Sequence, residues 1–230
     1  MTSVFITGCN RGLGLSLTKQ YLQKGAKVYG SCRNHAGARD LWELESDYEG
    51  RLTCFELDVS NESSIRGALK AMPEDWTIDV LINNAAVNLE FGNALSALTE
   101  EALLKSYQVN TIGPLFMSKH LMPFLANAQE PKIINISSKL GSIQDNNSGH
   151  HYPYRLSKTA LNMVTKNLAT EFPKILSLSI HPGWVQTDMG GPQAPLTPEE
   201  SAKSIVDVIS QSKLAQSGQF LDYSAEKLAY

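Results

Sequence analysis

The sequence predicts a single α/β domain, residues 1–230, in which a doubly wound parallel sheet of about seven strands carries helices on both faces. Three observations carry this prediction. Short runs of β-branched residues alternate with longer helical periods, as they do in βαβ units. Three glycines, Gly8, Gly12 and Gly14, stand within seven residues at the first strand-to-helix junction. No break in composition divides the 230 residues into two domains.

The elements are expected in strict alternation, beginning with a strand. The strands are expected at Val4–Thr7, Lys27–Ser31, Leu52–Leu57, Val80–Asn83, Lys132–Ser137, Leu176–His181 and Phe220–Tyr223. The helices are expected near 12–24, 36–48, 62–72, 99–126, 152–172 and 198–211. The last helix has the clearest start, because Thr197 suits the N-cap, Pro198 the first helical position, and Glu200 the third position after the cap.

Two irregular segments, 140–151 and 187–197, are rich in Gly, Asn, Ser and Pro. Each follows the carboxyl end of an expected strand, which is where an open α/β sheet binds its ligands. We therefore expect both segments to border a substrate.

Composition and charge exclude several classes of protein. A formal net charge of −3 argues against a nucleic-acid surface. No apolar run approaches the roughly 20 residues of a membrane span, and the first residues lack the features of a secretion signal. We expect a cytoplasmic protein without a membrane partner. The odd count of Cys9, Cys32 and Cys54 fits reduced core thiols, and the five histidines lack metal-ligand spacing, so no metal site is expected.

The glycine cluster follows the first strand and opens the first helix. A turn of this kind directs backbone N–H groups and the positive end of a helix toward an anion. Gly8 lets the chain leave the strand, Gly12 permits close approach of a ligand, and Gly14 permits tight packing of helix and sheet. This position is the context that a dinucleotide site requires.

The spacing Thr-Gly-x-x-x-Gly-x-Gly at 7–14 resembles the short-chain dehydrogenase/reductase family. The later motifs follow in the family's order: LDV at 57–59, NNAA at 83–86, VNTIG at 109–113, ISS at 136–138, YRLSK at 154–158 and HPGWVQT at 181–187. Together they span essentially the whole chain. The resemblance implies a Rossmann-type fold and an oxidoreductase that uses a nicotinamide cofactor.

By this resemblance, four residues form the catalytic set. Tyr154 is the general acid in carbonyl reduction and the base in the reverse direction, while Ser138 hydrogen-bonds the substrate oxygen. Lys158 lowers the pKa of Tyr154 and holds the cofactor ribose, and Asn110 positions a water that continues the proton relay. Ser137 competes for the serine role, but strand alternation sends the two serines to opposite faces, and the family pattern favours Ser138.

Helix spacing and electrostatics also explain, without the resemblance, why a tyrosine and a lysine would stand four residues apart. Residues four apart on a helix project from one face. Lowering a phenol pKa from near 10 by about two requires roughly 2.7 kcal/mol. One close ammonium offers about 4 kcal/mol at an effective dielectric constant of about 20, before desolvation losses. We therefore expect Lys158 to make Tyr154 more acidic.

The resemblance also implies a set of residues that contact the cofactor, with Asp58 placed against adenine. The set comprises Gly8, Asn10, Arg11, Gly12, Leu13, Gly14, Arg33, Asp58, Val59, Asn84, Ala85, Ala86, Tyr154, Lys158, Pro182, Gly183, Val185 and Thr187.

The end of the second strand indicates which nicotinamide cofactor is used. NAD-specific members place an acidic residue there to accept the ribose hydroxyls. The corresponding residue here is Cys32, which Arg33 follows, and Arg11 lies within the glycine turn. Two guanidinium groups suit a 2′-phosphate, because arginine binds phosphate through paired donors. The expected cofactor is NADP(H).

Two features depart from the family pattern. The interval from Ser138 to Tyr154 is sixteen residues, about three more than is common, and the extra length falls in QDNNSGHHYP. Ala86 occupies a position where the family usually has glycine. A positive φ at Ala86 would cost roughly 1 kcal/mol or more, whereas ordinary torsion angles would cost little.

Within the family, the motifs ITGCNRGLGL, LGSIQ, YPYRLSK and HPGWVQTDMGG are similar to the Sniffer-type carbonyl reductases and the related C-factor branch. This similarity implies NADPH-dependent reduction of small carbonyl compounds such as quinones and reactive aldehydes or ketones. Trp184 and Met189 are candidate pocket residues. Two alternatives remain open: a dehydrogenase for an alcohol or steroid-like substrate, and an NADP-bound sensor with little turnover. The family usually dimerises through helices corresponding to 99–126 and 152–172, so a homodimer is expected.

Overall fold

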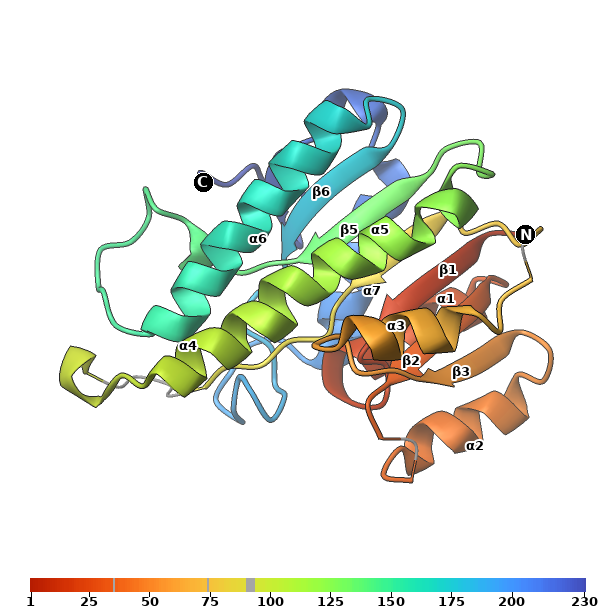
Figure 1. Ribbon diagram of the computed structural model, residues 1–230, viewed down its shortest axis with the longest axis horizontal. Coiled ribbons are helices and arrows are strands. Elements are labelled where there is room, and N and C mark those ends of the chain that lie inside the picture. The colour runs from red at the N-terminus through yellow and green to blue at the C-terminus, as the bar shows by residue number, and fades with distance from the viewer. Residues whose placement is uncertain (35, 74, 90–93) are drawn as a thin grey trace.

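Seven parallel strands form one sheet in the centre of the molecule, as the computed structural model in Figure 1 shows for the described residues 1–34, 36–73, 75–89 and 94–230. The strands are β1 Ser3–Thr7, β2 Lys27–Cys32, β3 Leu52–Glu56, β4 Val80–Asn83, β5 Lys132–Ile136, β6 Leu176–His181 and β7 Gln219–Asp222. Strands β1 and β4 are buried along their full length, and β2, β5 and β6 at all but one end residue, as expected for strands covered on both faces.

The strand order is β3-β2-β1-β4-β5-β6-β7. The chain builds outward from β1 to β3, then returns to the other side of β1 to begin β4. The carboxyl ends of β1 and β4 therefore lie side by side where the direction of winding reverses. This switch point is where a doubly wound sheet binds its ligand.

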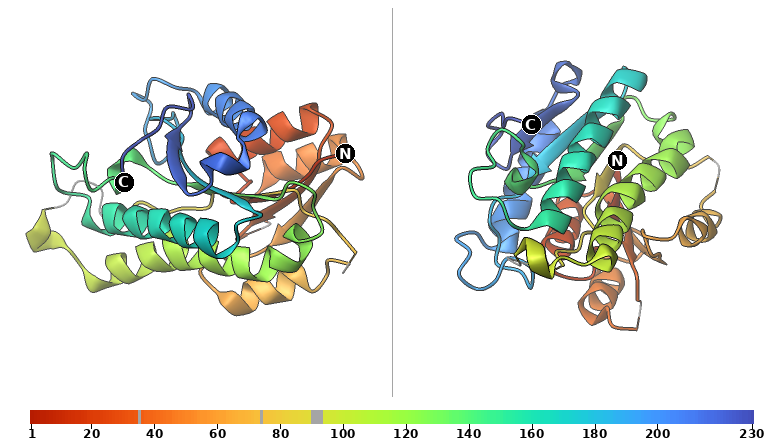
Figure 2. Two further views of the ribbon diagram at one scale, coloured as in Figure 1. Left: turned by 90° about the horizontal axis from the view of Figure 1, so that it is seen from above. Right: turned by 60° about the vertical axis from the view of Figure 1, so that its left-hand side comes forward.

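Helices cover both faces of the sheet (Figure 2). The helices are α1 Gly12–Gln23, α2 Arg39–Asp47, α3 Glu62–Leu69, α4 Glu100–Tyr107, α5 Gly113–Leu125, α6 Tyr152–Glu171 and α7 Pro198–Gln211. One hydrophobic cluster joins α1, α2 and α7 to the sheet, and a second joins α3, α5 and α6 to the opposite face. The alternation of strand side chains divides the core: Val4 and Ile6 belong to the first cluster and Phe5 to the second.

Local sequence fixes the starts of several helices. The Thr197 hydroxyl accepts a hydrogen bond from the Glu200 backbone N–H, and the Glu200 carboxylate accepts one from the Thr197 N–H. This capping box, with Pro198 in the first helical position, confirms the predicted start of α7. Asn61 and Thr99 cap α3 and α4 in a similar way.

Several predicted boundaries differ from the structure. The stretch 99–126 is not one regular helix, because a π-helical turn, Gln108–Ile112, separates α4 from α5. The helix predicted from residue 36 begins at Arg39, and the one predicted to residue 72 ends at Leu69. Strand β7 lies one residue earlier than predicted. Within the described ranges, no helix is long and apolar enough to cross a bilayer.

Candidate functional site

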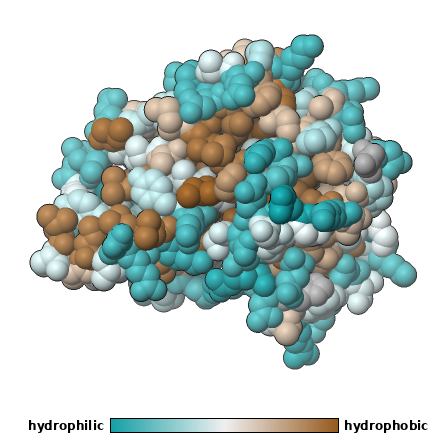
Figure 3. All heavy atoms as spheres, in the orientation of Figure 1, coloured by the Kyte–Doolittle hydropathy of each residue, from teal (hydrophilic) through white to brown (hydrophobic). Residues whose placement is uncertain are grey.

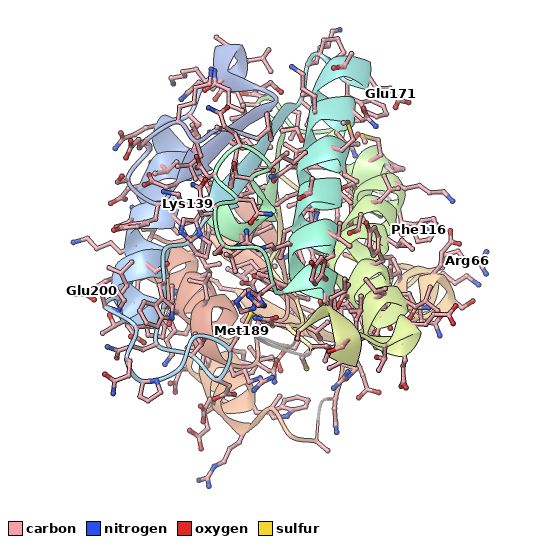
Figure 4. The ribbon with its side chains drawn as sticks, turned by 90° about the vertical axis from the view of Figure 1, so that its left-hand side faces the viewer. Arg66, Phe116, Lys139, Glu171, Met189 and Glu200 are labelled. Carbon is pink, nitrogen blue, oxygen red and sulfur yellow. The ribbon has the colours of Figure 1, made fainter. Side chains whose placement is uncertain are left out.

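The predicted site residues converge on the carboxyl edge of the sheet, which faces the viewer in Figure 4. Lys139, from a short 3-10 turn after β5, and Met189, from the segment after β6, both lie on this face. The glycine turn after β1 and the amino end of α6 complete it. Segments far apart in the sequence thus supply one site.

The glycine turn has the conformation that its spacing predicts. Gly8 and Gly12 have positive φ angles of 67° and 51°. A Cβ atom on Gly8 would lie 3.0 Å from the Ala85 Cα atom, and one on Gly14 would overlap the Gly8 carbonyl oxygen. Side chains at these positions would therefore force the turn open. Asn10 and Leu13, in the same turn, are both partly buried.

Thr7 and Asn84 hold the turn in place. The Thr7 hydroxyl accepts hydrogen bonds of 3.0 Å from the backbone N–H groups of Asn84 and Ala85. The Asn84 side chain donates bonds of 2.9 and 3.1 Å to the carbonyl oxygens of Thr7 and Gly8. Asn84 thus joins the end of β4 to the end of β1. The sequence prediction did not include Thr7; a polar residue at the end of a buried strand was the available signal.

The amino end of α1 fits an anionic ligand. Its N-cap, Arg11, makes no side-chain capping bond, and its first turn contains no acidic residue. By contrast, α3, α4 and α7 begin with capping side chains and acidic first turns. The first N–H groups of α1 lack the side-chain acceptor that satisfies those of the other three helices. With the glycine cradle, they fit the pyrophosphate of a dinucleotide.

Arg33 and Asp58 lie together on the predicted adenosine side of the site. Burial alone would raise the pKa of Asp58. Hydrogen bonds from Ser60 and the nearby charges of Lys105 and Arg33 instead hold that pKa below its ordinary value. Cys32 is buried and Arg33 is exposed. Val59, beside Asp58, packs in the second hydrophobic cluster.

Arg11 contacts the segment after β6. Its guanidinium forms an ion pair with Asp188, and both side chains are largely exposed. The binding of a 2′-phosphate by Arg11 together with Arg33 stays a prediction. The ion pair joins the glycine turn to the 187–197 segment.

The segment after β6 approaches the glycine turn. Gly183 has a φ of 83°, and a Cβ atom there would overlap Leu196. Pro182 accepts a hydrogen bond from Ser201 of α7, and Val185 forms a β-bridge with Leu196. A cavity of about 430 Å³ is lined by Gln186, Thr187, Asp188, Gly191 and Pro192. A Cβ atom on Gly12 would lie 3.2 Å from the Thr187 methyl group.

Tyr154, Ser138 and Lys158 form a buried group beside this turn. All three are at most 8% exposed. The Ser138 hydroxyl lies close enough to the Tyr154 phenol to lower its pKa, and the Lys158 ammonium lies 5.6 Å from the centre of the Tyr154 ring. Ser137 points elsewhere and donates a 2.7 Å bond to Asn162. The structure thus brings Ser138, and not Ser137, to the tyrosine, as strand alternation requires.

The protein groups alone leave the pKa of Tyr154 raised, and the lowering that Lys158 is expected to give in the working site stays a prediction. Burial raises the pKa of Tyr154 to about 12, and the nearby Ser138 hydroxyl opposes this only in part. Burial also lowers the pKa of Lys158 to about 7. Burial disfavours the charged form of each group, and this desolvation outweighs the attraction between phenolate and ammonium. In the protein without its cofactor, the phenol is therefore protonated at neutral pH.

Asn110 lies in the π-helical turn, and its carboxamide is hydrogen-bonded to the protein. Its oxygen accepts a 2.8 Å bond from the Val87 N–H, and its nitrogen donates to the Val87 carbonyl at 2.8 Å and to the Ser157 hydroxyl at 3.0 Å. Asn110 thus ties the segment after β4 to α6. Both amide hydrogens are used in this way, and the part of Asn110 in positioning a water stays a prediction.

Ala86 does not adopt the strained conformation considered above. Among the described residues, positive φ at non-glycine positions occurs at His150, His151 and Ala225. Ala86 therefore has ordinary torsion angles, and its methyl group does not require left-handed backbone. Within the same part of the chain, no group of three His, Cys, Asp or Glu residues is arranged to hold a metal.

Comparisons with known proteins agree with this arrangement. Residues 2–197 match the family described as short chain dehydrogenase. The C-signal protein of Myxococcus xanthus is 35% identical over 155 residues, which cover 66% of this chain and 93% of that protein.

Solved structures are similar over the full length. The carbonyl reductase Sniffer of D. melanogaster is 36% identical with a TM-score of 0.92, and all of both chains is covered. The NADPH-bound carbonyl reductase from chicken fatty liver is 33% identical with a TM-score of 0.94, covering 100% of this chain and 99% of that one. With its fold, its glycine turn and its tyrosine–lysine pair, the chain belongs to the short-chain dehydrogenase family of oxidoreductases.

Proposed function

We propose that the chain is an NADPH-dependent reductase of small carbonyl compounds such as quinones and reactive aldehydes or ketones. The observation that carries the proposal is the buried Tyr154, which lies beside the Ser138 hydroxyl and the Lys158 ammonium at the carboxyl edge of the sheet. A protonated phenol beside a second hydroxyl is suited to give a proton to a carbonyl oxygen. The NADPH-bound structure of a similar carbonyl reductase supports the choice of cofactor.

The chain's own residues divide the work as follows. The glycine turn and the open amino end of α1 would hold the pyrophosphate, and the Arg33 guanidinium would donate hydrogen bonds to the 2′-phosphate. Ser138 and Tyr154 bind the carbonyl oxygen, and Tyr154 donates the proton. Lys158 holds the ribose and supplies positive charge beside the phenol. The cofactor supplies the hydride when bound.

Two apolar side chains border the site. Trp184 is 56% exposed, and its indole N–H donates a 2.7 Å bond to the Gly190 carbonyl, which fixes the ring. Met189 is 40% exposed and lies over the carboxyl edge (Figure 4). An apolar surface formed by Trp184 and Met189 favours the binding of planar, hydrophobic carbonyl compounds and discriminates weakly among them.

The sensor alternative, which the likeness to the C-factor branch makes worth testing, is not favoured, because Asn110, Ser138, Tyr154 and Lys158 are all present. Ala86 in place of glycine would support it, but Ala86 does not have a positive φ. The dehydrogenase alternative is not favoured either, because Cys32 is not acidic and cannot accept the ribose hydroxyls of NAD.

The test is NADPH consumption by the purified protein with a panel of quinones, aldehydes and ketones. NADH in place of NADPH provides the cofactor control. The proposal predicts steady turnover with several members of the panel and a clear preference for NADPH. No consumption with any of them, despite NADPH binding, would contradict it and favour the sensor.

We also propose that the protein is cytoplasmic and forms a homodimer through α4, α5 and α6. Large apolar side chains are exposed on these helices and the π-helical turn, and hydrophobic surface gathers there in Figure 3. They are Leu104, Ile112, Leu115, Leu156 and Met163. Light scattering should give twice the chain mass, falling to one mass for Leu156→Glu.

A further inference from the structure

Arg155 follows Tyr154 in the sequence but is buried, with only 8% of its surface exposed. Its guanidinium makes three directed hydrogen bonds. Nη1 donates to the Leu140 carbonyl at 3.1 Å, Nε to the Gly149 carbonyl at 3.0 Å, and Nη2 to the Ser148 hydroxyl at 2.9 Å. A buried cation requires such partners, because its desolvation is otherwise costly.

These partners lie at the two ends of one loop. Leu140 begins the 140–151 segment, and Ser148 and Gly149 belong to its end. Figure 1 shows this segment as the green loop that projects from the sheet beyond the amino end of α6. One planar side chain therefore closes the loop that carries the extra length between Ser138 and Tyr154.

The closing end of the loop has an unfavourable backbone conformation. Gly149, His150 and His151 have successive positive φ angles of 62°, 55° and 52°. Side chains other than glycine adopt this region only where the surroundings fix them. Arg155 contacts this turn twice, because its side chain binds the Gly149 carbonyl and its backbone N–H binds the His151 carbonyl at 2.9 Å.

The rest of the loop is also ordered by hydrogen bonds. The Ser142 hydroxyl accepts one from the Asp145 N–H, and the Asn146 side chain accepts one from the Gly149 N–H, both at 3.1 Å. The Gln144 N–H donates a 3.1 Å bond to the carbonyl of Tyr230. The loop therefore has a defined shape that can act as a wall.

The base of the loop touches the catalytic helix. Gly141 packs so closely on Lys158 that a Cβ atom there would lie 2.9 Å from the lysine backbone carbon. The Thr159 hydroxyl donates a 2.9 Å bond to the Gly141 carbonyl. The loop begins two residues after Ser138 and ends three residues before Tyr154, so a change in its shape can alter the positions of both.

We propose that Arg155 is a positioning residue that clips the 140–151 loop shut and so keeps one wall of the substrate site in a fixed shape. The inference rests on the proposed function for its effect on substrate, but the clip itself does not. Arg155 acts on substrate binding through the loop and leaves the chemical step to Ser138, Tyr154 and Lys158.

The clip is tested by hydrogen exchange of the loop amides in the wild type, Arg155→Ala and Arg155→Lys. Arg51→Ala is a matched control, because Arg51 also donates to a backbone carbonyl, that of Leu22 at 2.9 Å, far from this loop. The proposal predicts that amides of 141–149 exchange at least about tenfold faster in Arg155→Ala. Arg155→Lys should also loosen the loop, because an ammonium cannot span both ends. Unchanged exchange in both variants would overturn the clip.

Kinetics test what the clip does. In Arg155→Ala, the KM for the carbonyl substrate should rise about tenfold, while kcat and the KM for NADPH change less than about threefold. Methylguanidinium in the buffer should restore the lower KM, and methylammonium should not. A loosened loop with an unchanged carbonyl KM would overturn the role in substrate binding. If the wild type consumes no NADPH with any carbonyl, the proposed function fails, and the exchange measurement still decides the clip.

Discussion

The Lys158 ammonium lies 5.6 Å from the centre of the Tyr154 ring and donates its 2.8 Å hydrogen bond to the carbonyl oxygen of Ile136. Both residues are buried. We therefore expect the pair to carry charge during the reaction. Burying that charge lowers the stability of the protein when no cofactor is bound. Two predictions follow from this arrangement.

Replacing Lys158 by Met should stabilise the fold while abolishing activity. Burial lowers the Lys158 pKa from 10.5 to about 7, so charging this residue at pH 7 opposes folding. Lys158→Met removes this desolvation cost but also loses the hydrogen bond to Ile136. The net effect should be to raise the free energy of unfolding by about 2–4 kcal/mol. The unfolded chain binds the proton more readily, so wild-type stability rises between pH 7 and 10.5, and the gain of Lys158→Met shrinks over that window. Urea unfolding at several pH values measures this, and a destabilised variant would contradict it.

The pH profile of reduction should fall above neutrality. The value of kcat/KM for NADPH reports the groups of the free enzyme. Lys158 is charged below about pH 7 and neutral above it, whereas Tyr154 with its pKa of about 12 stays protonated. We expect kcat/KM for NADPH to decrease as the pH rises through about 7, with the slope that corresponds to the loss of a single proton. An increase through the same range would mean that the neutral lysine is the working form.

Arg33 should determine the cofactor preference more strongly than Arg11. Arg11 is already paired with Asp188, whereas Arg33 is exposed beside Asp58. Arg33→Asp should weaken NADPH binding at least about tenfold, the loss expected for one charge-assisted hydrogen bond, and leave NADH binding equal or better. Arg11→Ala, the matched control, should weaken NADPH less. Fluorescence titration gives both affinities, and unchanged NADPH affinity in Arg33→Asp would refute the assignment.

Ala86→Gly should leave turnover unchanged and lower the free energy of unfolding by about 0.5–1 kcal/mol. Ala86 has ordinary torsion angles, so glycine adds only freedom to the unfolded chain. Thermal unfolding and NADPH consumption check the two parts. A gain in activity with glycine would show that the methyl group crowds the site after all.

The sequence predicted the alternating fold and the conformation of the glycine turn correctly because these depend on local patterns, whereas the catalytic role of Tyr154 stays a prediction. Hydrophobic periodicity places Val4–Thr7 in the sheet, and the four-residue spacing places Tyr154 and Lys158 on one face of α6. Once the order of the parallel strands is known, Gly8, Asn84 and Ser138 are expected to lie together, because the carboxyl ends of neighbouring strands meet at one edge of the sheet.

Other features could not be predicted because they depend on contacts distant in the sequence. Arg11 finds Asp188, 177 residues away, and no local signal reports that pairing. The Asn110 carboxamide is hydrogen-bonded to Val87 and Ser157. The pKa of Tyr154 depends on burial by several elements, which the spacing of two residues does not reveal. No local pattern predicts that the Arg155 side chain is buried, because its partners belong to the 140–151 loop.

Hydride transfer in a single turnover tests the central claim most directly. NADPH-loaded wild type and Tyr154→Phe are each mixed with one quinone that the wild type reduces, and NADPH fluorescence is followed. We predict that Tyr154→Phe still binds NADPH but transfers hydride at least about a thousandfold more slowly, because the proton donor is gone while Ser138 and Lys158 remain. A Tyr154→Phe protein that transfers hydride at the wild-type rate would contradict it.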